Sequence, residues 1–235
     1  VPVPVDEQWR IDLAAIDPAD AARALCLWVN TPGNPAGGLD DLDAAARWGR
    51  EHDVVVLSDE CYAEFTWDGP PRTVLTSGSD GVLAVHSLSK RSNLAGVRAG
   101  FYAGDAELVH YLQEVRKHAG FMLPGPVQAA AVAALADDAH VDVQRERYRA
   151  RLESLAAVLT AAYDVEVALP GGGFYLWIPA PGGDAWAFTR TLAVDAGMLV
   201  SPGEFYGEAG SGHVRIAVVQ PDDRIELVAQ RLAAL

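Results

Sequence analysis

The sequence predicts an α/β fold, with a mostly parallel sheet in a large domain and a smaller α+β domain after it. Residues 24–29 are continuously apolar, which is typical of a strand buried on both faces of a parallel sheet. Residues 39–52 then place apolar side chains on one side of a helix, and 54–58 is a second apolar run. Strand, helix and strand in this order favour a layered α/β domain.

The same alternation continues to about residue 140. The apolar runs at 82–86 and 100–104 predict two more strands, and 105–117 and 127–135 predict helices. Between these helices, Pro124-Gly125-Pro126 is expected to interrupt the chain, because proline lacks the donor that a helix interior needs. We therefore place the large domain at residues 1–140.

Residues 141–235 predict the smaller α+β domain. A long helix is expected at 141–163, and we interpret its arginines as a solvated face (Arg145, Arg147, Arg149 and Arg151). Residues 165–169 alternate like a half-buried strand and 174–178 are apolar, so a hairpin across the glycine-rich turn is expected. Further strands are expected at 198–200 and 213–218, and helices at 186–196 and 222–232.

Composition excludes several classes of function. The formal net charge is −14 and no run is rich in lysine and arginine, which argues against nucleic acid as a partner. No apolar run reaches the length of a membrane span, so no membrane partner is expected. Cys26 and Cys61 make neither a disulfide framework nor a metal site. We interpret both as buried free thiols, which suits a reducing cytoplasm.

Polar residues come after the expected strands at one edge of the sheet. Asn34, Asp59 and Lys90 each come just after a strand, where ligands of parallel sheets bind. A lysine held at such an edge can lose its proton and attack a carbonyl. Two hydroxyls before it (Ser87 and Ser89) and an arginine after it (Arg98) could hold a phosphate. This combination indicates pyridoxal phosphate, the alternative being a solvated lysine in a serine-rich turn.

Other polar residues also have two interpretations. Asp59 could keep a pyridine nitrogen protonated, or it could cap a turn. Tyr62 and Asn34 could each donate a hydrogen bond to a phenolate oxygen. Alternatively, Tyr62 is an aromatic residue at an interface and Asn34 is a turn residue. Arg215 lies in an apolar strand, where it could bind a substrate carboxylate or be a surface arginine on an edge strand.

Taken together, these residues resemble a known family. The chain carries Asn34-Pro35-Ala36-Gly37, then Asp59 with Tyr62, then Ser87-Leu88-Ser89-Lys90, then Arg98 and Arg215. In order and spacing this set resembles the class I/II aminotransferases of pyridoxal phosphate fold type I, over the whole chain. The family's large domain has helices on both faces of its sheet. One departure is Ala36, where the family usually has threonine.

The resemblance implies a role for each residue. Lys90 would bind the cofactor covalently and act as general acid and base, with Asp59 and Tyr62 as its catalytic partners. The other implied contacts are Asp59 to the ring nitrogen, Asn34 and Tyr62 to the phenolate oxygen, Ser87, Ser89 and Arg98 to the phosphate, and Arg215 and Asn34 to the substrate. The resemblance also implies a homodimer with its sites at the subunit interface.

A finer resemblance concerns the substrate. The runs 89–96, 114–120, 175–177 and 202–207 are similar to those of actinobacterial succinyldiaminopimelate aminotransferases of lysine biosynthesis. The succinyl carboxylate would need its own cation, and Arg91, Arg116 and Lys117 are the candidates, with Arg91 nearest to Lys90. The alternatives are another class I/II aminotransferase (aspartate, alanine or aromatic type), a pyridoxal phosphate carbon–sulfur lyase, and a truncated inactive homologue.

The family pattern also contains parts that have no counterpart in this sequence. These are an N-terminal arm, a Gly/Ser loop under the phosphate and an aromatic side chain stacked on the ring. We therefore expect the chain to be the rear part of the large domain plus the small domain. On that expectation, the chain alone is not a competent enzyme.

Overall fold

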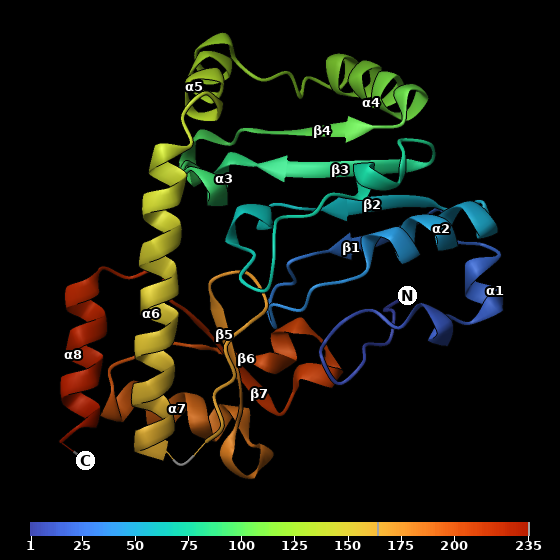
Figure 1. Cartoon of the computed structure of the whole chain (residues 1–235). Coiled ribbons are helices and arrows are strands. Elements are labelled where there is room, and N and C mark those ends of the chain that lie inside the picture. The colour runs from blue at the N-terminus through green and yellow to red at the C-terminus, as the bar shows by residue number, and fades with distance from the viewer. Residues whose placement is uncertain (164, 235) are drawn as a thin grey trace. The chain divides into compact units, whose positions relative to one another are not determined.

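The computed structural model describes residues 1–163 and 165–234. The chain forms two compact units (Figure 1). The first unit comprises Val1–Gly33 and Gly38–Asp142, and the second comprises Asn34–Gly37 and Val143–Leu235. The short segment Asn34–Gly37 thus belongs with the C-terminal unit although it comes soon after the first strand. The division into domains at residue 140 stays a prediction.

The first unit contains a four-stranded sheet in the order β1-β2-β3-β4. Its strands are β1 (Cys26–Asn30), β2 (Val55–Asp59), β3 (Val82–Ser87) and β4 (Gly100–Gly104). The first three strands are parallel, and β4 is antiparallel to β3. The expectation of a mostly parallel sheet is confirmed, and each strand lies within two residues of its predicted range.

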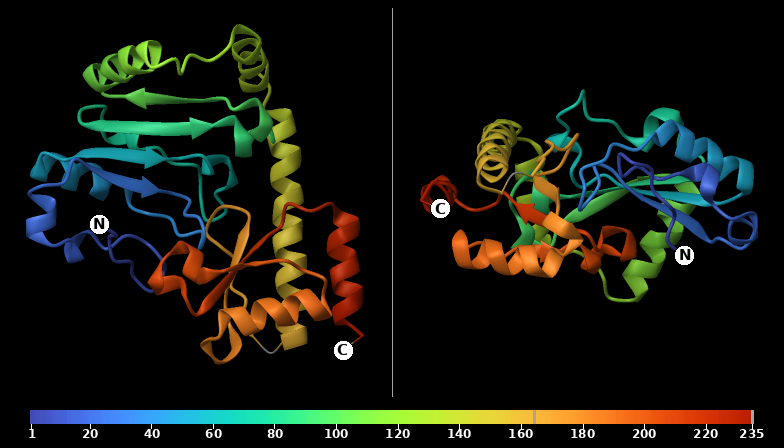
Figure 2. Two further views of the ribbon diagram at one scale, coloured as in Figure 1. Left: turned by 180° about the vertical axis from the view of Figure 1, so that it is seen from behind. Right: turned by 90° about the horizontal axis from the view of Figure 1, so that it is seen from below.

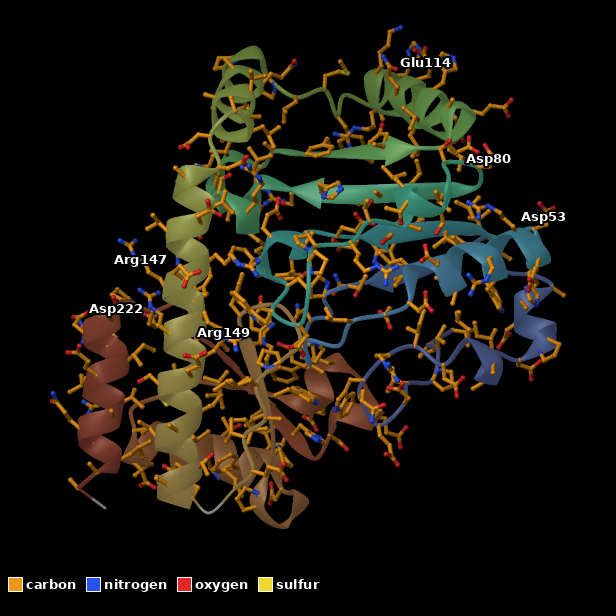
Figure 3. The ribbon with its side chains drawn as sticks, viewed as in Figure 1. Asp53, Asp80, Glu114, Arg147, Arg149 and Asp222 are labelled. Atoms are coloured by element: carbon orange, nitrogen blue, oxygen red, sulfur yellow. The ribbon has the colours of Figure 1, made fainter. Side chains whose placement is uncertain are left out.

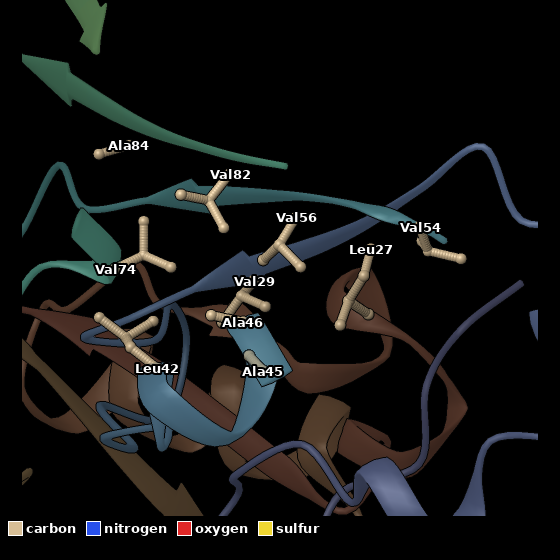
Figure 4. Close-up of a cluster of buried hydrophobic side chains, with 10 residues drawn as sticks. All are labelled: Leu27, Val29, Leu42, Ala45, Ala46, Val54, Val56, Val74, Val82 and Ala84. Carbon is tan, nitrogen blue, oxygen red and sulfur yellow. The ribbon is translucent and has the colours of Figure 1, made fainter. Parts of the chain in front are cut away.

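One face of this sheet packs on α2 (Leu42–His52). Asp41 caps the start of this helix, and its carboxylate accepts the N–H of Ala44. Figure 4 shows the resulting core, in which α2 side chains meet those of three strands. Gly49 permits the close approach, because an added Cβ would lie 2.5 Å from the Val56 side chain. The core residues are Leu27, Val29, Leu42, Ala45, Ala46, Val54, Val56, Val74, Val82 and Ala84.

The opposite face of β1 corrects two sequence-based expectations. Leu27 and Val29 are buried, but Cys26 is exposed and Trp28 is 55% exposed, so β1 is not buried on both faces. Cys61 is only half-buried, so the interpretation of both cysteines as buried thiols is also wrong. The reason is that α2 covers one face of β1, while the described residues leave the alternate side chains of that strand accessible.

The remaining helices of the first unit include the two predicted at 105–117 and 127–135, and a short one at 88–91 that was not predicted. They are α1 (Pro18–Ala21), α3 (Leu88–Arg91), α4 (Ala106–His118), α5 (Gly125–Leu135) and the first turn of α6 (Ala139–Tyr163). The proline pair does not delay α5, which begins at Gly125. Proline is tolerated in a first turn, where its missing N–H would be unpaired anyway.

The second unit packs helices around a three-stranded antiparallel sheet in the order β5-β7-β6. Figure 2 shows most of this unit, coloured from yellow to red, from two further sides. The strands are β5 (Tyr175–Pro179), β6 (Ser201–Pro202) and β7 (His213–Ala217). The helices are most of α6, α7 (Ala185–Asp195) and α8 (Asp222–Leu232). Leu152, Leu155 and Leu159 of α6 are buried, as the helical spacing of these leucines predicts.

The predicted hairpin of this unit is wrong. Residues 165–169 form no strand, and β5 pairs with β7 instead. Alternation alone does not make a strand without a partner, and here the N–H of Gly172 binds the Gly37 carbonyl at 3.0 Å. The short strand expected at 198–200 lies at Ser201–Pro202.

The arginines of α6 do not form one solvated face. Arg147 is exposed and Arg149 pairs with Glu153 on the same helix, but Arg151 reaches Asp222 at the start of α8. Figure 3 labels Arg147, Arg149 and Asp222 on these two helices. The Arg151 side chain is 12% exposed, because α8 lies against this part of α6. Across residues 1–163 and 165–234, no helix combines the length and apolarity that a membrane crossing requires.

Candidate functional site

The carboxyl ends of β2 and β3 bring the predicted cofactor residues of the first unit to one edge. The two strands are parallel neighbours, and Asp59 is in register with Val85, two residues before Ser87. β3 ends at Ser87, and α3 begins at the next residue. Asp59, Ser87, Ser89 and Lys90 therefore lie along one short stretch of the sheet edge, as the strand ends predict.

Lys90 lies beside Tyr62. Its ammonium nitrogen Nζ is 5.9 Å from the centre of the Tyr62 ring, and Tyr62 is only 4% exposed. A cation over an aromatic face is attracted by the negative charge density of the ring. Ser87 caps the short helix that carries Lys90, because its Oγ accepts the N–H of Ser89 at 3.1 Å. The amine is thus held over a buried phenol.

The Asp59 carboxylate is organised by Cys61. Its Oδ1 accepts the Cys61 N–H at 3.2 Å. Burial, with the nearby Asp59 carboxylate adding to it, raises the pKa of the Cys61 thiol. The thiol is therefore protonated at neutral pH and can donate toward Asp59. Sequence reasoning missed Cys61, and the only available signal was its position two residues after Asp59.

Arg98 is placed by the backbone that precedes β4. Its φ of 59° lies in the left-handed region, which is uncommon for a residue other than glycine. The carbonyl of the next residue, Ala99, accepts the N–H of Leu88 at 3.1 Å. This hydrogen bond brings the backbone at Arg98 close to the segment that carries Ser87 and Ser89. The Arg98 guanidinium is exposed, and Nη1 donates to the Ala95 carbonyl at 3.1 Å. It remains accessible to a ligand.

Arg215 is the charged centre of the second unit. It lies on β7, the middle strand of the sheet, so the alternative of an edge-strand surface arginine is wrong. Nη1 donates to Asn34 Oδ1 at 2.8 Å. The guanidinium carbon is 4.3 Å from the Tyr175 ring centre and 4.9 Å from that of Tyr206. Nε is buried and has no hydrogen-bond partner among the described residues.

Asn34 is held beside Arg215 by its own loop. Gly37 has a φ of +75°, and a Cβ there would lie 2.4 Å from the Pro170 side chain. Only glycine suits this position, and the Gly37–Gly172 hydrogen bond then fixes the segment. Because Asn34 and Tyr62 belong to different units, their shared contact with one ligand oxygen stays a prediction.

Sequence reasoning missed the tyrosines around Arg215. Tyr175 is at the start of β5, and Tyr206 ends a 3-10 turn, Gly203–Tyr206. Both lie in runs that the sequence singled out only for their resemblance to a subgroup. Which aromatic ring meets a given arginine depends on strand pairing, and no local pattern reports it.

Arg91 is not placed to bind a substrate carboxylate. Its Nε is 3.1 Å from a Glu64 carboxylate oxygen, and Nη2 contacts the Asp138 carboxylate. Nη1 donates to the Ala134 carbonyl at 2.9 Å, and the residue is 9% exposed. The protein's own acids already neutralise this cation, which corrects its assignment to a distal carboxylate. The other candidates, Arg116 and Lys117, are exposed on α4.

The residues at the first unit's edge fit pyridoxal phosphate. A carboxylate, a buried phenol and a lysine amine lie together, matching a ring nitrogen, a phenolate oxygen and an aldehyde. The serine hydroxyls and the accessible Arg98 guanidinium suit a phosphate. Among the described residues, no cluster of histidine, cysteine or acidic side chains is arranged to hold a metal ion.

Comparison with known proteins gives consistent results. The family model described as aminotransferase class I and II matches residues 1–232. The chain is 49% identical over 214 residues to the 4-dedimethylamino-4-oxo-anhydrotetracycline transaminase OxyQ of Streptomyces rimosus, covering 88% of this chain and 59% of that protein. It is 32% identical over 242 residues to LL-diaminopimelate aminotransferase of Dehalococcoides mccartyi, covering 99% of this chain and 62% of that protein.

A solved structure agrees with the sequence relatives. An aminotransferase from Neisseria meningitidis superposes with a TM-score of 0.88 at 33% sequence identity, covering 98% of this chain and 62% of that one. The chain therefore spans between 59% and 62% of the length of these three proteins.

Proposed function

Because this chain belongs to the class I and II aminotransferases and has their fold type I architecture, we propose that it moves an amino group between an amino acid and a 2-oxo acid, using pyridoxal phosphate. The observation that carries this proposal is the placement of Lys90 over Tyr62, at the edge where Asp59 ends the neighbouring strand.

Each residue of this edge has a chemical task in the proposed reaction. Pyridoxal phosphate, when bound, supplies an aldehyde that an amine can attack and a pyridine ring that accepts electrons. Lys90 would hold the cofactor through its aldehyde, and its Nζ would be the group that moves a proton to and from the substrate Cα. Asp59 keeps the ring nitrogen protonated, and its Cys61 contacts orient the carboxylate. Tyr62 Oη and Asn34 Nδ2 are the two groups that would donate to the phenolate oxygen.

The phosphate is assigned to Ser87, Ser89 and Arg98. The backbone pairing of Leu88 with Ala99 holds the Arg98 segment beside the serines. A guanidinium and two hydroxyls give charge-assisted hydrogen bonds, which are stronger than neutral ones. This grip is separate from the ring contacts of Asp59 and Tyr62.

Arg215 is assigned to the substrate α-carboxylate. Its partners are an amide oxygen and two aromatic rings, so its positive charge is not neutralised by a carboxylate among the described residues. The buried Nε offers a donor to an incoming anion. A planar guanidinium binds a carboxylate through two parallel hydrogen bonds, which also fixes the orientation of the substrate.

For the substrate, we favour N-succinyl-LL-diaminopimelate with 2-oxoglutarate as acceptor, in lysine biosynthesis. The subgroup runs and the 32% identity to an LL-diaminopimelate aminotransferase support this choice. A second candidate is an oxo substrate like that named for the tetracycline transaminase, because identity to that protein is higher, at 49%. Turnover of the holoenzyme with each amino donor would separate the two candidates.

We also propose a homodimer in the reducing cytoplasm. Large apolar side chains are exposed along α4 and α5 and the segment between them, which suits burial by a second subunit (Tyr111, Val115, Phe121, Met122, Val132 and Leu135). Both cysteines are free thiols, in agreement with a reducing compartment.

The central test is chemical tagging. The chain contains two lysines, Lys90 and Lys117. Borohydride reduction in the presence of pyridoxal phosphate, followed by peptide mapping, should fix the cofactor to Lys90. A tag on Lys117, or no tag at saturating cofactor, would contradict the proposal.

A further inference from the structure

We propose that Arg91 is a positioning residue for Lys90: it ties the short helix α3 to the segment after Tyr62 and to the chain before α6. The amine of Lys90 then stays over the Tyr62 ring. This inference rests on the proposed function, because it concerns the lysine that is assigned to the cofactor.

The helix that carries Lys90 cannot hold itself in place. α3 has four residues, Leu88–Arg91. A single helical turn is unstable alone, because nucleation fixes several dihedral angles for very few hydrogen bonds. The orientation of Lys90 must therefore come from contacts with other segments. Arg91 ends this turn and is 9% exposed, so its own side chain is mostly shielded from water.

The first contact joins α3 to the segment after Tyr62. Arg91 Nε lies 3.1 Å from Glu64, in the 3-10 turn Ala63–Phe65. Lys90 and Tyr62 join the same two segments, with Nζ 5.9 Å from the ring centre. Lys90 and Arg91 of α3 thus meet Tyr62 and Glu64. Two such contacts fix the direction of α3 as well as its distance from the other segment.

The second set of contacts joins α3 to the last turn of α5 and to the chain just after it. Nη1 donates to the Ala134 carbonyl at 2.9 Å and to Ser92 Oγ at 3.2 Å. Nη2 contacts Asp138, whose side chain is 82% exposed. One guanidinium therefore contacts two separate regions and is the buried member of its ion pairs.

Arginine is chemically required for this arrangement. Its planar fork presents donors in several directions, whereas a lysine ammonium is a compact point charge. Removing one partner of a buried charge pair leaves the other partner uncompensated. Small displacements of a catalytic amine have large effects on the reaction rate. The contacts of Arg91 that hold α3 in place therefore affect the rate at which Lys90 reacts.

The two lysines of the chain allow a test without cofactor. In competitive labelling with limiting formaldehyde and cyanoborohydride, the labelling ratio of Lys90 to Lys117 reports how accessible and basic the Lys90 amine is. Lys117 is an internal reference, since it lies exposed on α4 beside Glu114. Arg91→Met is expected to raise the ratio by about 3–10-fold, the scale of one lost hydrogen bond.

Further variants separate positioning from a general loss of structure. Glu64→Gln should also raise the labelling ratio, but by less than Arg91→Met does. The ratio of Arg91→Lys should lie between those of the parent and Arg91→Met. Combining Arg91→Met with Glu64→Gln should add little to Arg91→Met alone, because both remove the same contact. Arg147→Met, an exposed arginine on α6, should leave the ratio unchanged.

The outcomes decide the inference. A folded Arg91→Met variant with the parent ratio would overturn it, as would an equal change in Arg147→Met. If Arg91→Met does not fold, Glu64→Gln and Asp138→Asn decide the matter, and parent ratios in both would overturn it. Borohydride tagging of the unmutated protein checks the proposed function separately, since a tag on Lys117 would contradict that function whatever the labelling ratios are.

Discussion

The two units place their functional side chains by different means. In the first unit, Asp59 ends one strand and Lys90 lies one helical turn beyond the next, so the pairing of β2 with β3 brings them to one edge. In the second unit, Arg215 lies inside the middle strand and is surrounded by Asn34, Tyr175 and Tyr206, which come from distant parts of the sequence. The pairing of two neighbouring strands positions the first set, and packing between distant segments positions the second.

Two arginines show what this difference means for charge. The Arg91 guanidinium contacts Glu64 and Asp138, so its charge is used within the protein. The Arg215 guanidinium contacts an amide and two rings, so its charge is available to an anionic ligand. Burial alone does not distinguish a structural arginine from a binding one, whereas the charge of the partners does.

The largest effect is expected at the first unit's edge. Lys90→Ala should remove the borohydride-dependent tag and lower the transamination rate of the holoenzyme by on the order of 10⁴-fold, because the proton carrier is lost. Peptide mapping and single-turnover kinetics measure the two effects. Lys117→Ala is the matched control, and activity near the parent rate in Lys90→Ala would show that the edge is not the reaction centre.

Removing either binding arginine should give a smaller loss, of a different kind in each unit. Arg98→Ala should weaken cofactor affinity by roughly 1.5–3 kcal/mol, the scale of a hydrogen bond to a charged group. Arg215→Ala should leave cofactor affinity nearly unchanged and raise KM for amino acids, since it is assigned to the carboxylate. Cofactor titration and steady-state kinetics would distinguish them. If both variants lost cofactor affinity equally, the proposed division of tasks would be wrong.

The pH dependence of stability should depend on Asp40 in the first unit. Burial raises its pKa from 3.8 to about 6, against the opposing hydrogen bond from Ile11 N–H. Because the carboxyl pKa is raised, the contribution of Asp40 to the free energy of unfolding is fully present below pH 3.8. It is lost as pH rises through about 6.

Asp40→Asn should therefore raise the free energy of unfolding at pH 8 by roughly 1–2 kcal/mol, after allowance for partial exposure. It should also flatten the pH dependence between 4 and about 7. Urea unfolding at several pH values measures both effects, with the exposed Asp80→Asn as control. A variant less stable than the parent at pH 8 would contradict the expectation.

The smallest effect is expected from the rings around Arg215. Tyr206→Leu should raise KM for the amino acid by about 2–5-fold, the scale of one exposed cation–π contact. Tyr206→Phe retains the ring and should behave like the parent. Equal losses in both variants would show that the hydroxyl, not the ring, is the part of Tyr206 that matters.

The sequence alone was enough to predict the strands of the first unit, the helices α2, α4 and α5, the helices of the second unit, and the edge that carries Asp59, Ser87, Ser89 and Lys90. These features depend on periodicity and on the residue types just past each strand end, and both are properties of short stretches of chain. The predictions that failed concern partners. Among the described residues, the segment at 165–169 alternates but forms no strand, and β1 has an apolar run but only one covered face.

Only the tertiary structure decided which polar groups meet. Arg91 pairs with an acid 47 residues away, and Arg215 with an amide 181 residues away. No local pattern specifies such pairs, because any of several acids or amides satisfies the same side-chain chemistry until packing selects one. The sequence therefore identified the residues that could carry the chemistry, while the folded chain determined that Arg91 is paired with acids and that Arg215 meets no carboxylate among the described residues.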